Sequence, residues 1–178
     1  MKKQIFLSYA ILSAALAAFT VTGARAQHMA SLSNFKGVWA GVVTLGAGES
    51  FRYNLVIMEI SDAGLCSLLN INEEATELKR TLLGTDASQS SIREKNSMIY
   101  TFTNTGGVWS ETQTYIMNYL APGMLYCILG RQVNNARPDE ENPDENNTWH
   151  YVMQGILYHY ADRESLINGW DDFLKRYE

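Results

Sequence analysis

Residues of the types that carry most enzyme chemistry are few in this sequence and widely spaced. His150 and His159 are the two histidines in a segment that predicts regular structure, and nine positions separate them. In one regular strand this spacing places the imidazoles on opposite faces and about 30 Å apart, so they cannot share a metal ion. We therefore predict no metal site, no cofactor and no catalytic residue. The alternative, a small-barrel enzyme, would use a buried tyrosine with Arg131 or Glu111 for acid–base chemistry.

A set of aromatic and methionine side chains on strand-like segments is the more informative group. Tyrosine combines an apolar ring with a hydroxyl that needs a partner when it is buried, and methionine adapts to irregular shapes. On the inner face of a barrel, such side chains either line a pocket for an apolar or amphipathic ligand or fill the core. The candidate ligand-binding residues are Tyr53, Tyr100, Phe102, Tyr115, Met117, Tyr119, Tyr126, Tyr151 and Met153.

The polar segment 134–147 is a second candidate surface. It contains two prolines and five carboxylates, which exclude a central strand and predict a long solvated loop. The segment lacks the alternating ligand spacing and the central glycine of a calcium-binding EF-hand loop. As an alternative function, this loop would be the contact of an envelope protein–protein interaction module, such as an inhibitor or immunity factor.

The first 26 residues have the three parts of a bacterial secretion signal. Lys2 and Lys3 supply the positive charge, residues 5–19 are apolar, and residues 24–26 form a small-x-small cleavage site. The apolar run is shorter than the roughly 20 residues needed to span a bilayer. The sequence therefore predicts cleavage after Ala26 and a periplasmic or secreted protein without a membrane span.

Cleavage would leave 152 residues, the size of one domain. Loss of Lys2, Lys3 and Arg25 would lower the formal charge from −5 to −8. Nucleic-acid affinity comes mainly from lysine and arginine contacts to phosphate, so an acidic chain argues against DNA and RNA as partners. We expect a flexible lead-in over 27–34 and a single domain over 35–178.

Short runs of alternating apolar and polar residues after residue 35 indicate β-strands. In segment 51–60, the parity that includes Tyr53 and Leu55 is expected to face the core. The segment 61–64 has the composition of a hairpin turn. Segment 85–97 has few apolar residues and is either an edge strand or a loop. The whole pattern predicts eight or nine strands.

A helix over 162–177 is expected to end the domain. Asp162 is suited to cap it, and apolar residues then recur at helical spacing as far as Tyr177. Gly169 interrupts the pattern and is predicted to weaken or break the helix there. Its apolar face would cover the outside of the last strand.

Cys66 and Cys127 leave two alternatives open. An exported chain with an even number of cysteines favours a disulfide, which here would close a loop of about 60 residues. However, positions in the middle of non-neighbouring barrel strands rarely bring their Cα atoms within the roughly 7 Å that a disulfide requires. The pair is therefore either a disulfide or two buried thiols.

The tripeptide Gly37-Val38-Trp39 begins the first strand-like segment. It resembles the Gly-x-Trp signature of the lipocalins and the wider calycin group, and the order of strands followed by a helix is similar too. The resemblance implies an antiparallel meander closed into a barrel, with the helix packed outside; a β-sandwich is the alternative. It also implies that Trp39 fills the closed end beneath an arginine from a late strand, for which Arg131 is the candidate. We therefore expect an exported protein that binds a small apolar or amphipathic ligand.

Overall fold

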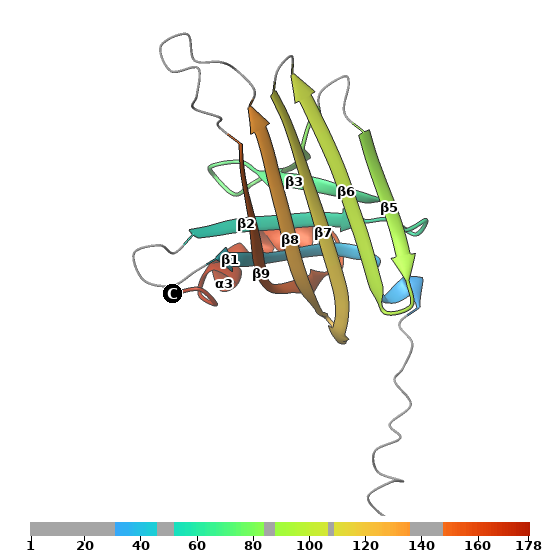
Figure 1. Ribbon diagram of the computed structural model, residues 1–178. Coiled ribbons are helices and arrows are strands. Elements are labelled where there is room, and N and C mark those ends of the chain that lie inside the picture. Colours follow the sequence, from blue (N-terminus) through green and yellow to red (C-terminus); the bar gives the residue numbers. More distant parts are fainter. Residues whose placement is uncertain (1–30, 46–51, 84–87, 107–108, 136–147) are drawn as a thin grey trace, which may run out of the picture.

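Nine strands and three short helices make up the part of the chain described by the computed structural model, which is residues 31–45, 52–83, 88–106, 109–135 and 148–178 (Figure 1). The predicted all-β class is confirmed. The helices are the 3-10 helix η1 (Leu32–Asn34), α2 (Arg163–Asn168) and α3 (Trp170–Leu174). The strands are β1 (Gly37–Leu45), β2 (Arg52–Ile60), β3 (Cys66–Ile71), β4 (Leu78–Arg80), β5 (Ser88–Glu94), β6 (Ser97–Gly106), β7 (Trp109–Ala121), β8 (Met124–Asn135) and β9 (Trp149–Tyr160).

Some of the predicted features lie outside the described residues. These are the secretion signal 1–26 and most of the acidic segment 134–147. Of the lead-in 27–34, residues 31–34 are described, and the side chain of Asn34 accepts a hydrogen bond from the backbone N–H of Ser31 at 2.7 Å. The helices of the described segments are too short and too polar to cross a membrane.

All nine described strands belong to one antiparallel sheet in the order β4-β3-β2-β1-β9-β8-β7-β6-β5. Two meanders, β1 to β4 and β5 to β9, are joined where the first strand pairs with the last. Gly41 of β1 lies opposite Leu157 of β9 on one side and Val56 of β2 on the other. The ambiguous segment 85–97 thus contains an edge strand, β5. The meander predicted from the sequence is confirmed.

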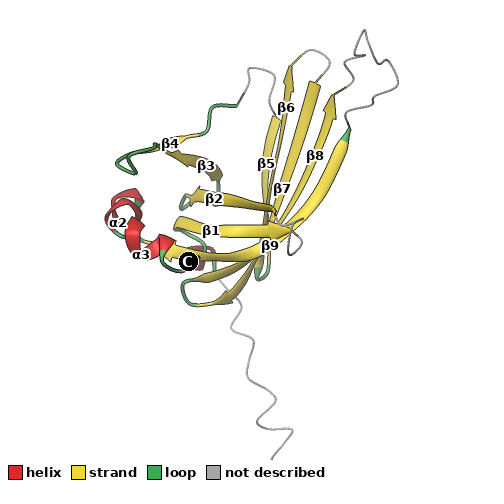
Figure 2. Ribbon diagram, turned by 90° about the vertical axis from the view of Figure 1, so that its left-hand side faces the viewer, coloured by secondary structure: helices red, strands yellow, loops and turns green. Residues whose placement is uncertain are grey.

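The odd number of strands excludes antiparallel closure of this sheet. Because every neighbouring pair is antiparallel, strand directions alternate along the sheet, and the two edge strands β4 and β5 run in the same direction. They cannot form an antiparallel pair with each other. The sheet instead curls into a half-barrel, in which the upright strands β5–β8 stand across the direction of β1 and β2 (Figures 1 and 2). A seam between β3–β4 and β5 lies where a closed barrel would have its last pair.

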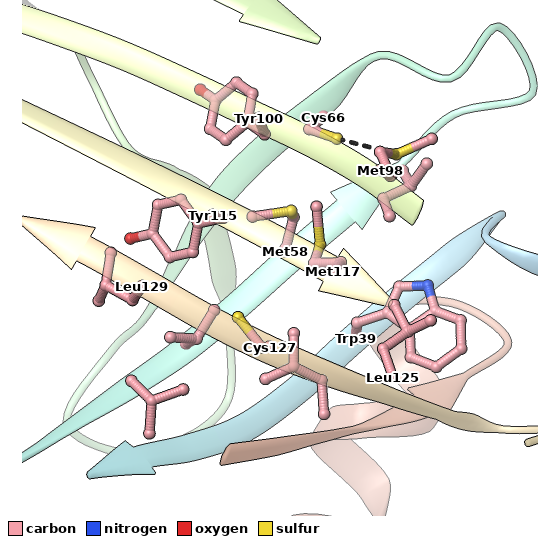
Figure 3. Packing of buried hydrophobic residues seen from close by; sticks show 14 of the residues in the cluster. Trp39, Met58, Cys66, Met98, Tyr100, Tyr115, Met117, Leu125, Cys127 and Leu129 are labelled. Carbon is pink, nitrogen blue, oxygen red and sulfur yellow. Dashed lines mark hydrogen bonds between the residues drawn. The ribbon is translucent and has the colours of Figure 1, made fainter. Parts of the chain in front are cut away.

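The concave face of the half-barrel carries the larger of two cores. Alternate residues of β6, β7 and β8 point into it, as period-two pleating requires. Figure 3 shows Trp39, Met58, Tyr115 and Leu129 converging there from four strands. We call this group the inner core.

A second core lies between the outer face of β1–β4 and the C-terminal helices. Leu166 of α2 and Phe173 of α3 pack with Val38, Ala40, Ile57, Leu69 and Leu78. The helix cap at Asp162 is confirmed, since its carboxylate accepts the Ser165 backbone N–H at 2.8 Å. The helical segment is divided at Gly169 into two helices, as the interruption there indicated, and they cover β1–β4 rather than the last strand alone (Figure 2).

The prediction of which alternate residues in segment 51–60 face the core was wrong. Tyr53 is 71% exposed and Leu55 is 37% exposed, whereas Val56, Met58 and Ile60 of β2 face the inner core. The pattern misled because this strand is apolar on both faces, with the inner core on one side and the helix-covered core on the other. Tyr53 therefore lies away from the inner face.

The expected contact between Trp39 and Arg131 was also wrong. Trp39 pairs with His159 on β9, whereas Arg131 pairs with Tyr151, eight residues or about 26 Å away along the same strand. The residue packed on the indole is His159, whose ring centroid is 4.9 Å from that of Trp39. Trp39 itself is 1% exposed, and its Nε1 donates to the carbonyl of Phe35 at 2.6 Å.

Candidate ligand-binding cleft

The seam of the half-barrel contains a cleft, which we call the seam cleft. It consists of two adjoining hollows of about 380 and 290 Å³. Both hollows are lined by Ser67 of β3, Arg80 of β4 and Gln89 of β5. The larger hollow is within the range of about 300–1,000 Å³ typical of small-molecule sites, and the smaller one is just below it.

The short strand β4 explains why this part of the sheet is open. Its three residues pair only with Leu69–Ile71, so the start of β3 faces β5 instead. There the backbone N–H of Cys66 donates to the Ser91 hydroxyl at 3.3 Å. A side chain thus satisfies a donor that a neighbouring strand would satisfy in a closed barrel.

One wall of the seam cleft is polar without being strongly charged. The hydroxyls of Ser61, Ser67, Ser90 and Ser91 line the first hollow together with the Gln89 amide. That amide also accepts a hydrogen bond from the Tyr100 hydroxyl at 3.2 Å. Hydroxyl and amide groups both donate and accept hydrogen bonds, so this wall suits an oxygen-rich head group.

The other wall is apolar and leads inward. Leu68 and Leu83 line the second hollow and pack against the inner core, and Tyr100 lines the same hollow from within that core. At the mouth, Leu65 is 65% exposed and Leu82 is 92% exposed. A ligand with an apolar chain would cover these leucines and remove apolar surface from water.

Three charged side chains lie at the polar end of the seam cleft. Arg163 donates to both carboxylate oxygens of Glu59, from Nε at 3.1 Å and from Nη2 at 2.7 Å. Arg80 makes a longer contact, with 3.5 Å between its Nη2 and Oε2 of Glu59. The hydrogen bonds from Arg163, with a smaller contribution from Arg80, hold the pKa of Glu59 below its ordinary value. Glu59 is therefore ionised at neutral pH.

Cys66 and Cys127 are free, buried thiols in the structure and form no disulfide. The Cys66 thiol, which lines the first hollow, lies 3.4 Å from the Met98 sulfur (Figure 3). Burial raises the pKa of Cys66 to about 11 and that of Cys127 to about 12. Both side chains are thus protonated across the physiological pH range.

We expect both thiols to resist alkylation in the folded protein. The thiolate is the reactive form, and raised pKa values keep it scarce at mildly alkaline pH. Iodoacetamide should leave the folded chain unmodified but add two carbamidomethyl groups in denaturant without reductant, as read by mass spectrometry. A disulfide would instead prevent any addition until a reductant was present.

Most of the aromatic and methionine residues predicted from the sequence lie in the inner core. Tyr100, Phe102, Tyr115, Met117 and Met153 are buried there, and Tyr119 and Tyr151 pack against it. Tyr126 is on the opposite face of β8 from buried Leu125 and Cys127, and its hydroxyl donates a hydrogen bond to the side-chain carbonyl oxygen of Gln154. Within the described residues, Tyr100 is the member of this set that lines the seam cleft.

A polar network at the far end of the concave face brings together residues considered for acid–base chemistry. Arg131 donates to Glu111 from Nε at 2.5 Å and to the Tyr151 hydroxyl from Nη1 at 2.9 Å. Gln113 links Glu111 to Tyr115, whose hydroxyl donates to the Gln113 carbonyl oxygen at 2.5 Å. The hydrogen bond to Glu111 raises the pKa of Arg131, and burial raises that of Tyr115. The polar side chains of this network thus supply hydrogen-bond partners for one another.

Within the described part of the chain, few side chains of this network line a hollow. Arg131 and Tyr151 line a third hollow of about 270 Å³, whereas Glu111 lines none of the three. The described part of the chain also contains no group of three or more histidine, cysteine, aspartate or glutamate side chains that could hold a metal ion. The seam cleft is therefore the better candidate for a functional site.

Comparisons with protein-family models, curated proteins and solved structures found no match. The antiparallel meander and its half-barrel are consistent with a lipocalin-like fold, and that likeness rests on the chain's own geometry.

Proposed function

We propose that this protein is an exported binding protein that holds a small amphipathic ligand in the seam cleft. The carrying observation is the continuity of the cleft from serine and glutamine side chains to leucines and Tyr100 next to the inner core. A ligand with a polar head and an apolar chain matches both ends. Export is the part of the proposal that comes from the secretion signal expected at residues 1–26.

The proposal differs from the sequence-based expectation in where the ligand binds. The inner core is packed with the side chains that were expected to line a ligand pocket, such as Tyr115 and Met117. The seam offers space without displacing them. The alternative contact surface, segment 134–147, lies mostly outside the described residues and stays a prediction.

Filling the cleft should weaken binding. We expect Ser67→Trp to raise the Kd for decanol about tenfold or more, because Ser67 lines both hollows and an indole would occupy much of their volume. Backbone amide NMR shifts during titration would measure the Kd, and in the parent protein they should concentrate at Ser67, Gln89 and Ser91. Gln89→Trp, on β5 across the seam from β3, should have the same effect.

Ser110→Trp is the matched control, since Ser110 is also a half-buried serine on a strand but lines none of the hollows. It should leave the Kd unchanged. Unaltered affinity in both cleft variants, or shifts centred on Arg131 instead of the seam, would contradict the proposal. Far-ultraviolet circular dichroism and the amide NMR spectra of the ligand-free variants would establish that each variant keeps the parent fold.

A further inference from the structure

The charges at the polar end of the seam cleft point to the class of ligand. We propose that the cleft prefers an amphipathic anion, and that Arg80 is the residue that meets the anionic head group. The inference rests on the proposed function of the same cleft and adds the chemistry of the ligand to it.

Glu59, Arg80 and Arg163 do not balance in charge. Arg163 is held in place by three hydrogen bonds: it donates twice to Glu59 and once, from Nη1, to the Leu78 carbonyl at 3.1 Å. One carboxylate therefore faces two guanidinium groups, which leaves a local excess of one positive charge. This excess occurs in a chain whose formal net charge is −5.

Arg80 is the cation of this group that a ligand can reach. Its side chain is 66% exposed, and its ion pair with Glu59 is the 3.5 Å contact rather than a close bidentate one. Among the described residues that line the two hollows, Arg80 and Glu59 are the charged ones, and Arg80 lines both. Glu59 is already held by Arg163, so Arg80 can turn toward a ligand without leaving that carboxylate unpaired.

The neighbours of Arg80 suit both parts of such a ligand. Ser67 and Gln89 line both hollows with it and can donate hydrogen bonds to an anionic oxygen. A guanidinium group can bind a carboxylate or a phosphate through two parallel N–H donors. Leu68 and Leu83 line the second hollow, where the apolar chain would lie.

Decanoate and decanol test the charge preference, because they share a chain length and differ in the head group. At neutral pH and low salt, we expect the parent protein to bind decanoate about five- to tenfold more tightly than decanol, the modest range appropriate to an exposed charged hydrogen bond. Arg80→Gln should remove this preference by weakening decanoate binding, and it should leave decanol binding unchanged.

Lys79→Gln is the matched control. Lys79 is also an exposed cation on β4, paired at 2.8 Å with Glu77, but it does not line the hollows. The preference for decanoate should survive in this variant. Equal loss of preference in Lys79→Gln and Arg80→Gln would overturn the role of Arg80. It would indicate that the anion is attracted by the general positive potential of β4 and not by direct contact with Arg80.

The other outcomes separate the two proposals. Equal binding of decanol and decanoate at the seam of the parent protein would overturn the anion preference and leave the proposed function standing. If neither compound shifts the amide signals of Ser67, Gln89 and Ser91, the proposed function fails and the preference fails with it.

Discussion

Replacement of Trp39 by alanine is expected to lower the free energy of unfolding by about 3–5 kcal/mol. The indole is 1% exposed and packs in the inner core, so truncation leaves a large cavity and orphans the Phe35 carbonyl that accepts from Nε1. Whole domains are stable by only about 5–15 kcal/mol, so this single change would remove a large share. Urea unfolding measures the loss as a lower midpoint at an unchanged slope.

Trp149→Ala is the matched control for this prediction. Trp149 is 40% exposed and stacks on Tyr151 at a centroid distance of 5.3 Å, so its truncation should cost about 1 kcal/mol. Trp39→Phe, which keeps most of the ring volume, should fall between the two alanine variants. A loss of less than about 1 kcal/mol for Trp39→Ala would mean that the half-barrel is not organised around β1.

Alanine at Gly155 or Gly41 is expected to destabilise the protein by about 3 kcal/mol, at the upper end of the range for overpacking. A Cβ on Gly155 would overlap the Val42 carbonyl oxygen and lie 3.0 Å from the Cα of Val43. A Cβ on Gly41 would overlap the Ile156 carbonyl oxygen. Both obstacles are backbone atoms in the β1–β9 pair, which cannot move aside as a flexible side chain can.

Gly130→Ala supplies the comparison, because this glycine is also in the middle of a strand. The nearest atom to its added Cβ is the Thr114 carbonyl oxygen at 4.0 Å, an ordinary contact distance. This variant should be neutral or more stable by about 0.5 kcal/mol, since alanine restricts the unfolded chain. Thermal unfolding of the three variants ranks them, and equal midpoints would contradict the close approach of β1 and β9.

Local pattern predicted much of the fold. The alternation around Tyr100 and Phe102 identified a strand with one buried face. The helix cap at Asp162 and the break at Gly169 were predicted from the residues at those positions. Such features depend on near neighbours in the chain. The pattern failed in β2, where the two cores make both faces apolar and period-two alternation loses its meaning.

The candidate site was beyond sequence reasoning because no local signal identifies it. Ser67, Arg80 and Gln89 have ordinary surface residue types, and they meet only because β4 ends after three residues at one edge of an odd-numbered sheet. The same dependence on register misplaced Arg131, whose distance from Trp39 is set by how β8 and β9 align. Both the position of the seam cleft and the distance between Trp39 and Arg131 therefore depend on how strands pair, which local sequence patterns do not reveal.

The pairing of β1 with β9 also has a consequence for how the chain acquires its structure. Ala40 lies opposite Tyr158, which is 118 positions later, whereas each pair within the two meanders joins strands that follow one another in the sequence. Closing so long a loop is entropically costly and slow compared with hairpin formation. During synthesis, one edge of β1 therefore stays without its partner strand until β9 has been made. That delay keeps the nascent chain incompletely folded until its last strand is available.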